Sequence, residues 1–170
     1  MSQMPLQAMT QWKSKHSNRR ERDGTAPELI REFALRLLAR REHSVLELHY
    51  KLVRRGFEAT QITSVLEQLV TEELLNDARY AEMYAYSRVD KGYGPLRIER
   101  ELRERGVSEE IVSATLKHLN GVWMEKLTAL HRKRFTAVSA DHIAEQSRQM
   151  RFLRQRGFTL EQIRCLLRSL

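Results

Sequence analysis

The sequence predicts an all-α protein made of three tandem three-helix repeats that form an elongated, gently curved body. The first observation behind this is an Arg-Gly pair that occurs three times, with glycines 50 and 51 residues apart, at Gly56, Gly106 and Gly157. The second is a leucine four residues before each glycine and apolar residues six, ten and thirteen residues after it. The third is composition, because only three prolines and seven glycines among 170 residues favour helix.

The apolar offsets define two helices around each glycine. Spacings of three and four residues bring side chains onto one helical face. A glycine that follows a helix is the usual left-handed residue that ends it, and the arginine before it complements the negative end of the helix dipole. Two residues later, Glu58, Ser108 and Thr159 mark the start of the next helix, and Thr159 with Gln162 predicts a capping box.

The repeat period divides the chain into four parts. Residues 1–26 show no apolar period and are expected to form a mobile basic tail. Three repeats follow, over residues 27–75, 76–120 and 121–170. A unit of about 50 residues buries too little apolar surface to be very stable alone, so neighbouring units are expected to pack against each other.

Each repeat is expected to open with a helix of its own, over residues 27–41, 77–90 and 122–135. The apolar faces of these helices are assigned to residues at helical spacing: Leu35, Leu37 and Leu38, then Tyr80, Met83 and Tyr84, then Trp123, Leu127 and Leu130.

The middle helices of the repeats differ in how they begin. Ser44 with Glu47 predicts a capping box in the first repeat, and Gly94 followed by Pro95 is a favoured helix start in the second. The third repeat has neither signal, so the boundary at which its middle helix begins can be placed only roughly, near residues 137–141.

The net charge of +8 is unevenly distributed along the chain. Residues 121–170 hold ten basic and four acidic side chains and carry +6, the tail carries +3, and the two central repeats are nearly neutral. Such a field favours a polyanionic partner, either nucleic acid or an acidic protein surface, although a basic surface can also serve solubility.

Two groups of basic residues are the candidate partner-binding sites. Both lie at helical spacing, and few acidic residues offset the second group, which makes it an electrostatic footprint. The alternative is that both groups are merely solvated helix faces. The second repeat contributes Arg88, Lys91, Arg97, Arg100 and Arg103, and the third contributes Arg132, Lys133, Arg134, Arg148, Arg151 and Arg154.

Other classes of function find little support. No segment approaches the roughly 18 apolar residues that span a bilayer, and the single cysteine, Cys165, fits a reducing cytoplasm. The histidines lack metal-ligand spacing, and carboxylates such as Glu99 and Glu104 alternate with arginines as in surface ion pairs. The glycines of residues 92–95 predict a tight turn between helices, since Pro95 removes an amide that a phosphate loop would need. We therefore expect no enzyme, no cofactor and no metal.

Cys165 takes the repeat position that Ser64 and Ala114 hold in the other units. All three residues are small, which predicts a close approach of helices there and a structural cysteine.

Three segments resemble the RecX family. Residues 34–48 (ALRLLARREHSVLEL) are similar to the family's leucine-rich opening, and residues 74–84 (LLNDARYAEMY) are similar to its Asp-x-Arg-aromatic-Ala block. Residues 91–98 (KGYGPLRI) carry the most specific string, Lys-Gly-x-Gly-Pro. The likeness begins near residue 28 and leaves out only the tail.

The resemblance implies an all-α protein that regulates the RecA recombinase. Members of the family lodge in the groove of the RecA filament on single-stranded DNA and restrain ATP hydrolysis, strand exchange and filament growth. By this resemblance the partner is the RecA–DNA filament, with nonspecific DNA contact, and we expect a cytoplasmic monomer that does not enter the membrane.

Two other functions stay open on the sequence. Helices joined through a glycine turn can form helix-turn-helix modules that bind DNA directly. The expected recognition helices, however, carry Glu67, Glu109 and Glu110 and almost no base-reading side chains. A helical scaffold for another partner is the remaining possibility.

Overall fold

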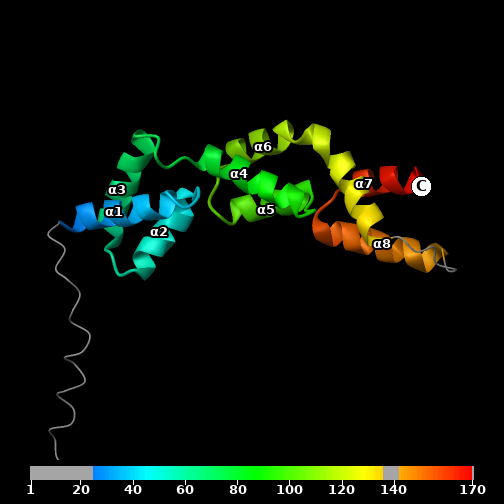
Figure 1. Cartoon of the computed structure of the whole chain (residues 1–170), viewed down its shortest axis with the longest axis horizontal. Coiled ribbons are helices and arrows are strands. Elements are labelled where there is room, and N and C mark those ends of the chain that lie inside the picture. The colour runs from blue at the N-terminus through cyan, green and yellow to red at the C-terminus, as the bar shows by residue number, and fades with distance from the viewer. Residues whose placement is uncertain (1–24, 136–141, 170) are drawn as a thin grey trace, which may run out of the picture.

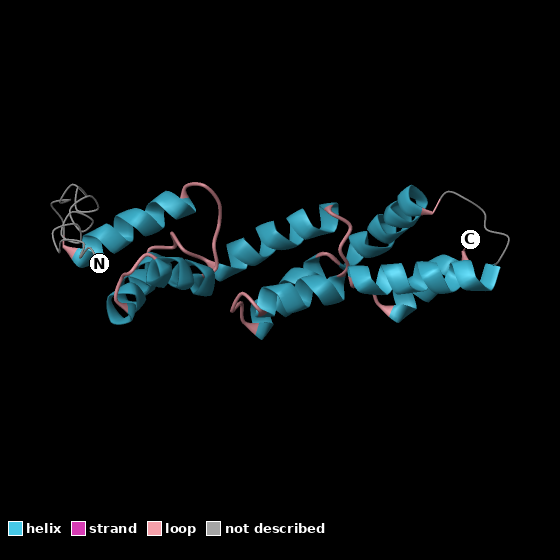
Figure 2. Cartoon of the chain, turned by 90° about the horizontal axis from the view of Figure 1, so that it is seen from below, coloured by secondary structure: helices cyan, strands magenta, loops and turns pink. Residues whose placement is uncertain are grey.

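The computed structural model describes residues 25–135 and 142–169. Across these residues the chain is helical, with no strand, and its helices fall into three groups that follow one another along an elongated body (Figure 1). The view turned by 90° shows the same row of three groups (Figure 2). The predicted fold class is therefore confirmed. The expected basic tail lies outside the described residues.

Unit 1 consists of α1 (Ala26–Leu38), α2 (Val45–Arg54) and α3 (Ala59–Thr71). The Ser44 hydroxyl caps α2 by accepting the backbone N–H of Glu47 at 3.1 Å. The expected capping box is only half formed, because the Glu47 carboxylate turns to basic side chains instead of back to the helix start.

Unit 2 consists of α4 (Asp77–Asp90), α5 (Pro95–Arg103) and α6 (Glu109–His118). The side chain of Asn76 caps α4 by accepting two backbone N–H groups, and Gly94 precedes α5 as its N-cap, as expected. Because Pro95 lacks an N–H that the first helical turn would leave unsatisfied, it suits the position after this cap.

Unit 3 follows the short helix η3 (Asn120–Val122) and consists of α7 (Trp123–Arg134), α8 (His142–Arg156) and α9 (Leu160–Arg168). The predicted capping box at Thr159 is formed in both directions, with distances of 3.0 and 3.1 Å. The segment in which α8 was expected to begin, residues 137–141, lies outside the described residues.

The three repeat glycines end the middle helices as predicted. Gly56, Gly106 and Gly157 have φ values of +94°, +77° and +92°, in the left-handed region that favours glycine. In each unit this turn joins the middle helix to the last one, and the leucine four residues earlier is fully buried. The repeat found in the sequence is therefore a repeat of structure.

The buried apolar side chains of the described residues form three clusters that share no member. Helices pack mainly against others of their own unit, as α1 does against α3 and α4 against α6. Neighbouring units were expected to pack against each other; they do meet, but among the described residues they bury no common apolar core. Trp123 comes nearest to linking two units, since it begins α7 but packs in the cluster of unit 2.

Some expected core positions also need correction. The face that α1 buries most deeply contains Ile30 and Ala34, while Leu35, Leu37 and Leu38 are only partly buried. Met83 is 62% exposed. Cys165 is exposed and so are its repeat counterparts, so small side chains there do not reflect a close approach of helices.

Units 1 and 2 meet at a small polar joint. The hydroxyl of Ser44, at the start of α2, donates to the backbone carbonyl of Arg105 at 2.7 Å. The carboxylate of Asp77, at the start of α4, accepts the backbone N–H of Val45 at 2.9 Å. The start of the middle helix in one unit thus binds the Arg-Gly turn of the next.

Units 2 and 3 meet in the same way, with two hydrogen bonds between backbone groups at the centre of the joint. The N–H of Gly94 donates to the carbonyl of Arg156 at 2.8 Å, and the N–H of Leu96 donates to the carbonyl of Gly157 at 3.0 Å. A Cβ atom on Gly94 would lie 2.5 Å from the backbone of Gly157. The residues expected to form a tight turn between helices therefore also form the joint to the next unit.

Candidate functional site

Two basic residues of unit 2 form ion pairs with a buried carboxylate. Glu101 of α5 is 7% exposed and lies 2.7 Å from Arg88 Nε and 3.0 Å from Arg97 Nε. The Tyr84 hydroxyl donates to Glu101 at 2.8 Å. Burial opposes ionisation of Glu101, but these hydrogen bonds and the two guanidinium charges outweigh it, so the pKa of Glu101 is lowered. Arg88 and Arg97 are thus half-buried and held by a carboxylate of their own unit.

An aromatic ring holds the same two arginines from another side. The guanidinium groups of Arg97 and Arg88 lie 4.3 and 5.1 Å from the centre of the Tyr93 ring. Arg156, from unit 3, lies 5.1 Å from that centre. Because such contacts are favourable, Tyr93 supports the joint between units 2 and 3 and limits what Arg88 and Arg97 can offer a partner.

The outer arginines of α5 are also compensated by neighbouring carboxylates. Arg103 Nη2 lies 2.7 Å from Glu99 and 2.6 Å from Glu109, and Arg100 Nε lies 3.6 Å from Glu104. These pairs are exposed, so each contributes little to stability, but each reduces the local positive field. In unit 2, only Lys91 among the candidate cations has no carboxylate within ion-pair distance in the described part of the chain.

The basic residues of unit 3 are compensated much less. Arg148 pairs with Glu145 at 2.8 Å. Arg134 lies 5.9 Å from the rings of Phe135 and Phe152, without an ion pair to any described residue. The rest of this group is exposed and has no acidic partner among residues 25–135 and 142–169: Arg132, Lys133, Arg151 and Arg154.

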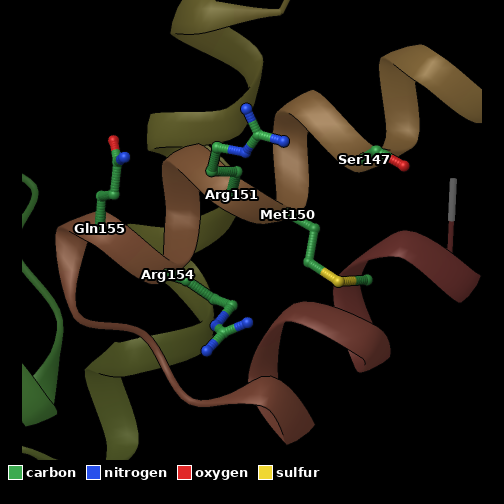
Figure 3. A pocket seen from close by; sticks show the side chains of 5 residues that line it. All are labelled: Ser147, Met150, Arg151, Arg154 and Gln155. Carbon is green, nitrogen blue, oxygen red and sulfur yellow. The ribbon is translucent and has the colours of Figure 1, made fainter.

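Two of these free cations line a hollow of about 450 Å³ on α8. Met150 and Arg154 point toward α9, while Arg151 and Gln155 point away from it (Figure 3). Ser147 completes the lining one turn earlier on the helix. Each of these guanidinium groups lacks a counter-ion among the described residues, so each can bind a phosphate or carboxylate group.

Other kinds of site find no support in the described residues. There, no three histidine, cysteine, aspartate or glutamate side chains gather as a metal site would require. No helix of that part is long and apolar enough to cross a membrane.

Comparison with known proteins gives the family. Models of the first, second and third three-helix domains of RecX match residues 31–69, 76–116 and 124–167. The regulatory protein RecX of Halorhodospira halophila is 46% identical over 143 residues, which cover 84% of this chain and 88% of that protein. The regulatory protein RecX of Pseudomonas savastanoi pv. phaseolicola is 40% identical over 141 residues, or 83% and 91% of the two chains.

This chain belongs to the RecX family. The fold agrees, because a crystal structure of RecX from Lactobacillus salivarius superimposes with a TM-score of 0.75 at 23% identity, over 85% of this chain and 96% of that one. A second crystal structure, of a regulatory protein RecX, also superimposes with a TM-score of 0.75, at 16% identity, over 97% of this chain and 80% of that one.

The geometry of this RecX-family chain divides the candidate residues into two groups. In its second domain Arg88 and Arg97 are held internally, and Arg100 and Arg103 face carboxylates. In its third domain most candidates are exposed and have no such partner among the residues that the structure describes. Glu101, Tyr84 and Tyr93, which hold the inner arginines, were missed as a group. Only the Arg97–Glu101 spacing of four residues could have indicated part of it.

Proposed function

We propose that this RecX-family chain is a non-enzymatic regulator of the RecA recombinase. It binds the groove of the RecA filament on single-stranded DNA and restrains ATP hydrolysis, strand exchange and filament growth. Membership of the RecX family, whose curated relatives are named regulatory proteins, supports this assignment. The observation that carries the mode of binding is the set of exposed, uncompensated cations on unit 3, in a body long enough to present several separate surfaces.

The free cations suit a nucleoprotein filament, which presents both DNA phosphates and acidic protein surface. The chain would act by occupying the groove and by binding one filament state more tightly than another, since a ligand shifts an equilibrium only through such a difference. We further propose that it works as a monomer in the cytoplasm.

The assay is ATP hydrolysis by RecA on single-stranded DNA. Substoichiometric amounts of the chain should slow hydrolysis severalfold, because one molecule bound in the groove affects the filament beyond the RecA subunits that it touches. Unchanged hydrolysis, together with no binding to filaments, would refute the proposal.

Direct DNA binding through helix-turn-helix modules is the alternative. The last helices of units 1 and 2 would be the recognition helices, and α6 begins with exposed Glu109 and Glu110, which repel phosphates. Titration of single-stranded and duplex DNA without RecA, at two salt concentrations, separates the two functions. Binding that is weak, salt-sensitive and independent of sequence fits the regulator, while tight sequence-dependent binding fits the alternative.

A further inference from the structure

An open groove of about 350 Å³ lies beside the joint between units 1 and 2. Unit 1 contributes one wall, with Arg41 and Glu42 before α2 and Glu47 within it. Unit 2 contributes the other wall: Tyr80, Met83, Tyr84, Ser87 and Arg105. The groove therefore exists only where two units meet, and none of the candidate cations lines it.

Tyr80 offers an unused hydrogen-bonding group in this groove. Its side chain is 3% exposed, yet no described residue forms a hydrogen bond with its hydroxyl. In the described part of the chain, every fully buried side-chain nitrogen or oxygen atom has a hydrogen-bond partner. Because the Tyr80 hydroxyl has none, it must be at least slightly exposed to solvent. Burial raises the pKa of Tyr80 from its ordinary value of 10 to about 12, so this hydroxyl is a proton donor at neutral pH and well above it.

The charges around the groove compensate one another. Arg41 Nη2 lies 2.5 Å from Glu47, and Glu42 lies 2.7 Å from Arg79 of unit 2. Arg105 donates from Nη1 to the backbone carbonyl of Glu101 at 2.7 Å. A charged occupant would gain little here, and a phosphate would come close to two carboxylates. Charge complementarity thus favours an uncharged occupant.

The aromatic rings of the groove leave little room for a stacked base. Tyr84 packs against Tyr80 with ring centres 5.8 Å apart. The guanidinium groups of Arg105 and Arg88 lie 4.5 and 5.0 Å from the centre of the Tyr84 ring. Because single-stranded nucleic acids bind largely by stacking bases on free aromatic faces, this groove suits a protein side chain better.

We propose that the groove between units 1 and 2 receives one uncharged, largely apolar side chain from the protein partner, with a hydrogen bond to the Tyr80 hydroxyl. The volume suits one large side chain, and Met83, 62% exposed at the edge, can adapt to its shape. This inference rests on the proposed function, in which the partner is a RecA subunit of the filament. An occupant would touch both units and so would also fix the angle between them.

The test is co-sedimentation of the full chain with RecA filaments on single-stranded DNA. Ser87→Trp fills the groove, and Ser113→Trp places the same side chain at an exposed position of α6 that does not line it. Ser87→Trp should weaken filament binding about tenfold, and Ser113→Trp should leave it unchanged. Tyr80→Phe, which removes only the hydroxyl, should weaken binding about fivefold without changing the circular dichroism spectrum.

The outcomes separate the groove from the function. If the wild-type chain binds filaments and Ser87→Trp binds equally well, the groove inference is wrong while the proposed function stands. If Ser87→Trp lowers affinity for naked single-stranded DNA as much as for filaments, the groove holds nucleic acid and the inference is again wrong. If the wild-type chain does not bind filaments at all, the proposed function fails, and the inference fails with it.

Discussion

Two glutamates each form ion pairs with two basic side chains and so reduce the positive charge that the surface presents. Glu101 holds Arg88 and Arg97 in unit 2, and Glu47 holds Arg41 and Lys51 in unit 1. Counting charges along the sequence treats all four cations alike. The structure separates cations that are paired with a partly or fully buried carboxylate from cations that have no ion pair in the described part of the chain, because burial of a carboxylate makes its ion pairs part of the scaffold.

The stability of unit 1 should depend on pH through Glu47. Burial opposes ionisation, but hydrogen bonds from Arg41 and Lys51 outweigh it and lower the pKa of Glu47 to about 2, from 4.5 in the unfolded chain. The ionised form therefore stabilises the fold fully above about pH 4.5, and this contribution is lost as the pH falls toward 2. Glu47→Gln should lower the melting temperature by roughly 3–6 °C at pH 7.

Thermal unfolding followed by circular dichroism at several pH values measures this effect. The difference in melting temperature between wild type and Glu47→Gln should be largest above pH 4.5 and close to zero at pH 2. Glu67→Gln, at an exposed position of α3, should stay close to wild type throughout. A difference for Glu47→Gln that stays constant from neutral pH to pH 2 would contradict the assignment.

The limits of sequence reasoning at this scale are physical. The pairing of Arg97 with Glu101 follows from a spacing of four residues in one helix. The contacts of Glu101 with Tyr84 and Arg88 join two helices, so no local spacing reveals them. The candidate cations could therefore be listed from the sequence. Which of them form ion pairs within the chain could not be predicted from it.

At the scale of the helices, one arrangement explains both joints. The start of a middle helix binds the Arg-Gly turn of the following unit, through Ser44 at the first joint and Gly94 at the second. The middle helix of unit 3 lacks both start signals, so the sequence gives no sign of the same arrangement there.

The second joint should be sensitive to a single methyl group. Gly94 has an ordinary φ of −91°, so Gly94→Ala introduces no backbone strain, but its Cβ would lie 2.5 Å from the backbone of Gly157. Gly121→Ala is the matched control, because a Cβ there meets nothing within 4 Å. Gly94→Ala should cost about 1–3 kcal/mol or force units 2 and 3 apart.

Small-angle X-ray scattering and thermal unfolding measure this change. Gly94→Ala should alter the scattering profile at low angles or lower the melting temperature, whereas Gly121→Ala should do neither. Profiles and melting temperatures of Gly94→Ala that match wild type would show that the joint does not exist in solution.

Helices and turns were largely predictable because their signals are local. Apolar spacing, cap residues and the turn glycines placed nearly every described helix within a few residues of its observed bounds. The joints were not predictable, because each has a backbone group as donor or acceptor, which every sequence possesses, and the two partners lie far apart in the chain. The separation of the three apolar cores could not be predicted either, because apolar periodicity shows which face of a helix is buried but not which neighbour covers it.

For the whole molecule, three separate cores and two small polar joints make a row of units with different surfaces. Unit 1 and unit 2 carry little net charge and form the groove between them, while unit 3 carries most of the candidate cations that have no ion pair to a described residue. We expect the affinity for a polyanionic filament, and its dependence on salt, to come mainly from unit 3.

The most direct test of this account is the binding of charge-reversal variants to RecA filaments on single-stranded DNA at two salt concentrations. Arg151→Glu with Arg154→Glu reverses two free cations of unit 3, and Arg100→Glu with Arg103→Glu makes the same change of charge at arginines that already face carboxylates. We predict that the wild-type chain binds, that the first variant loses at least tenfold in affinity and much of its salt dependence, and that the second loses at most threefold. Wild-type affinity in the first variant, or no binding of the wild-type chain to filaments, would contradict the account.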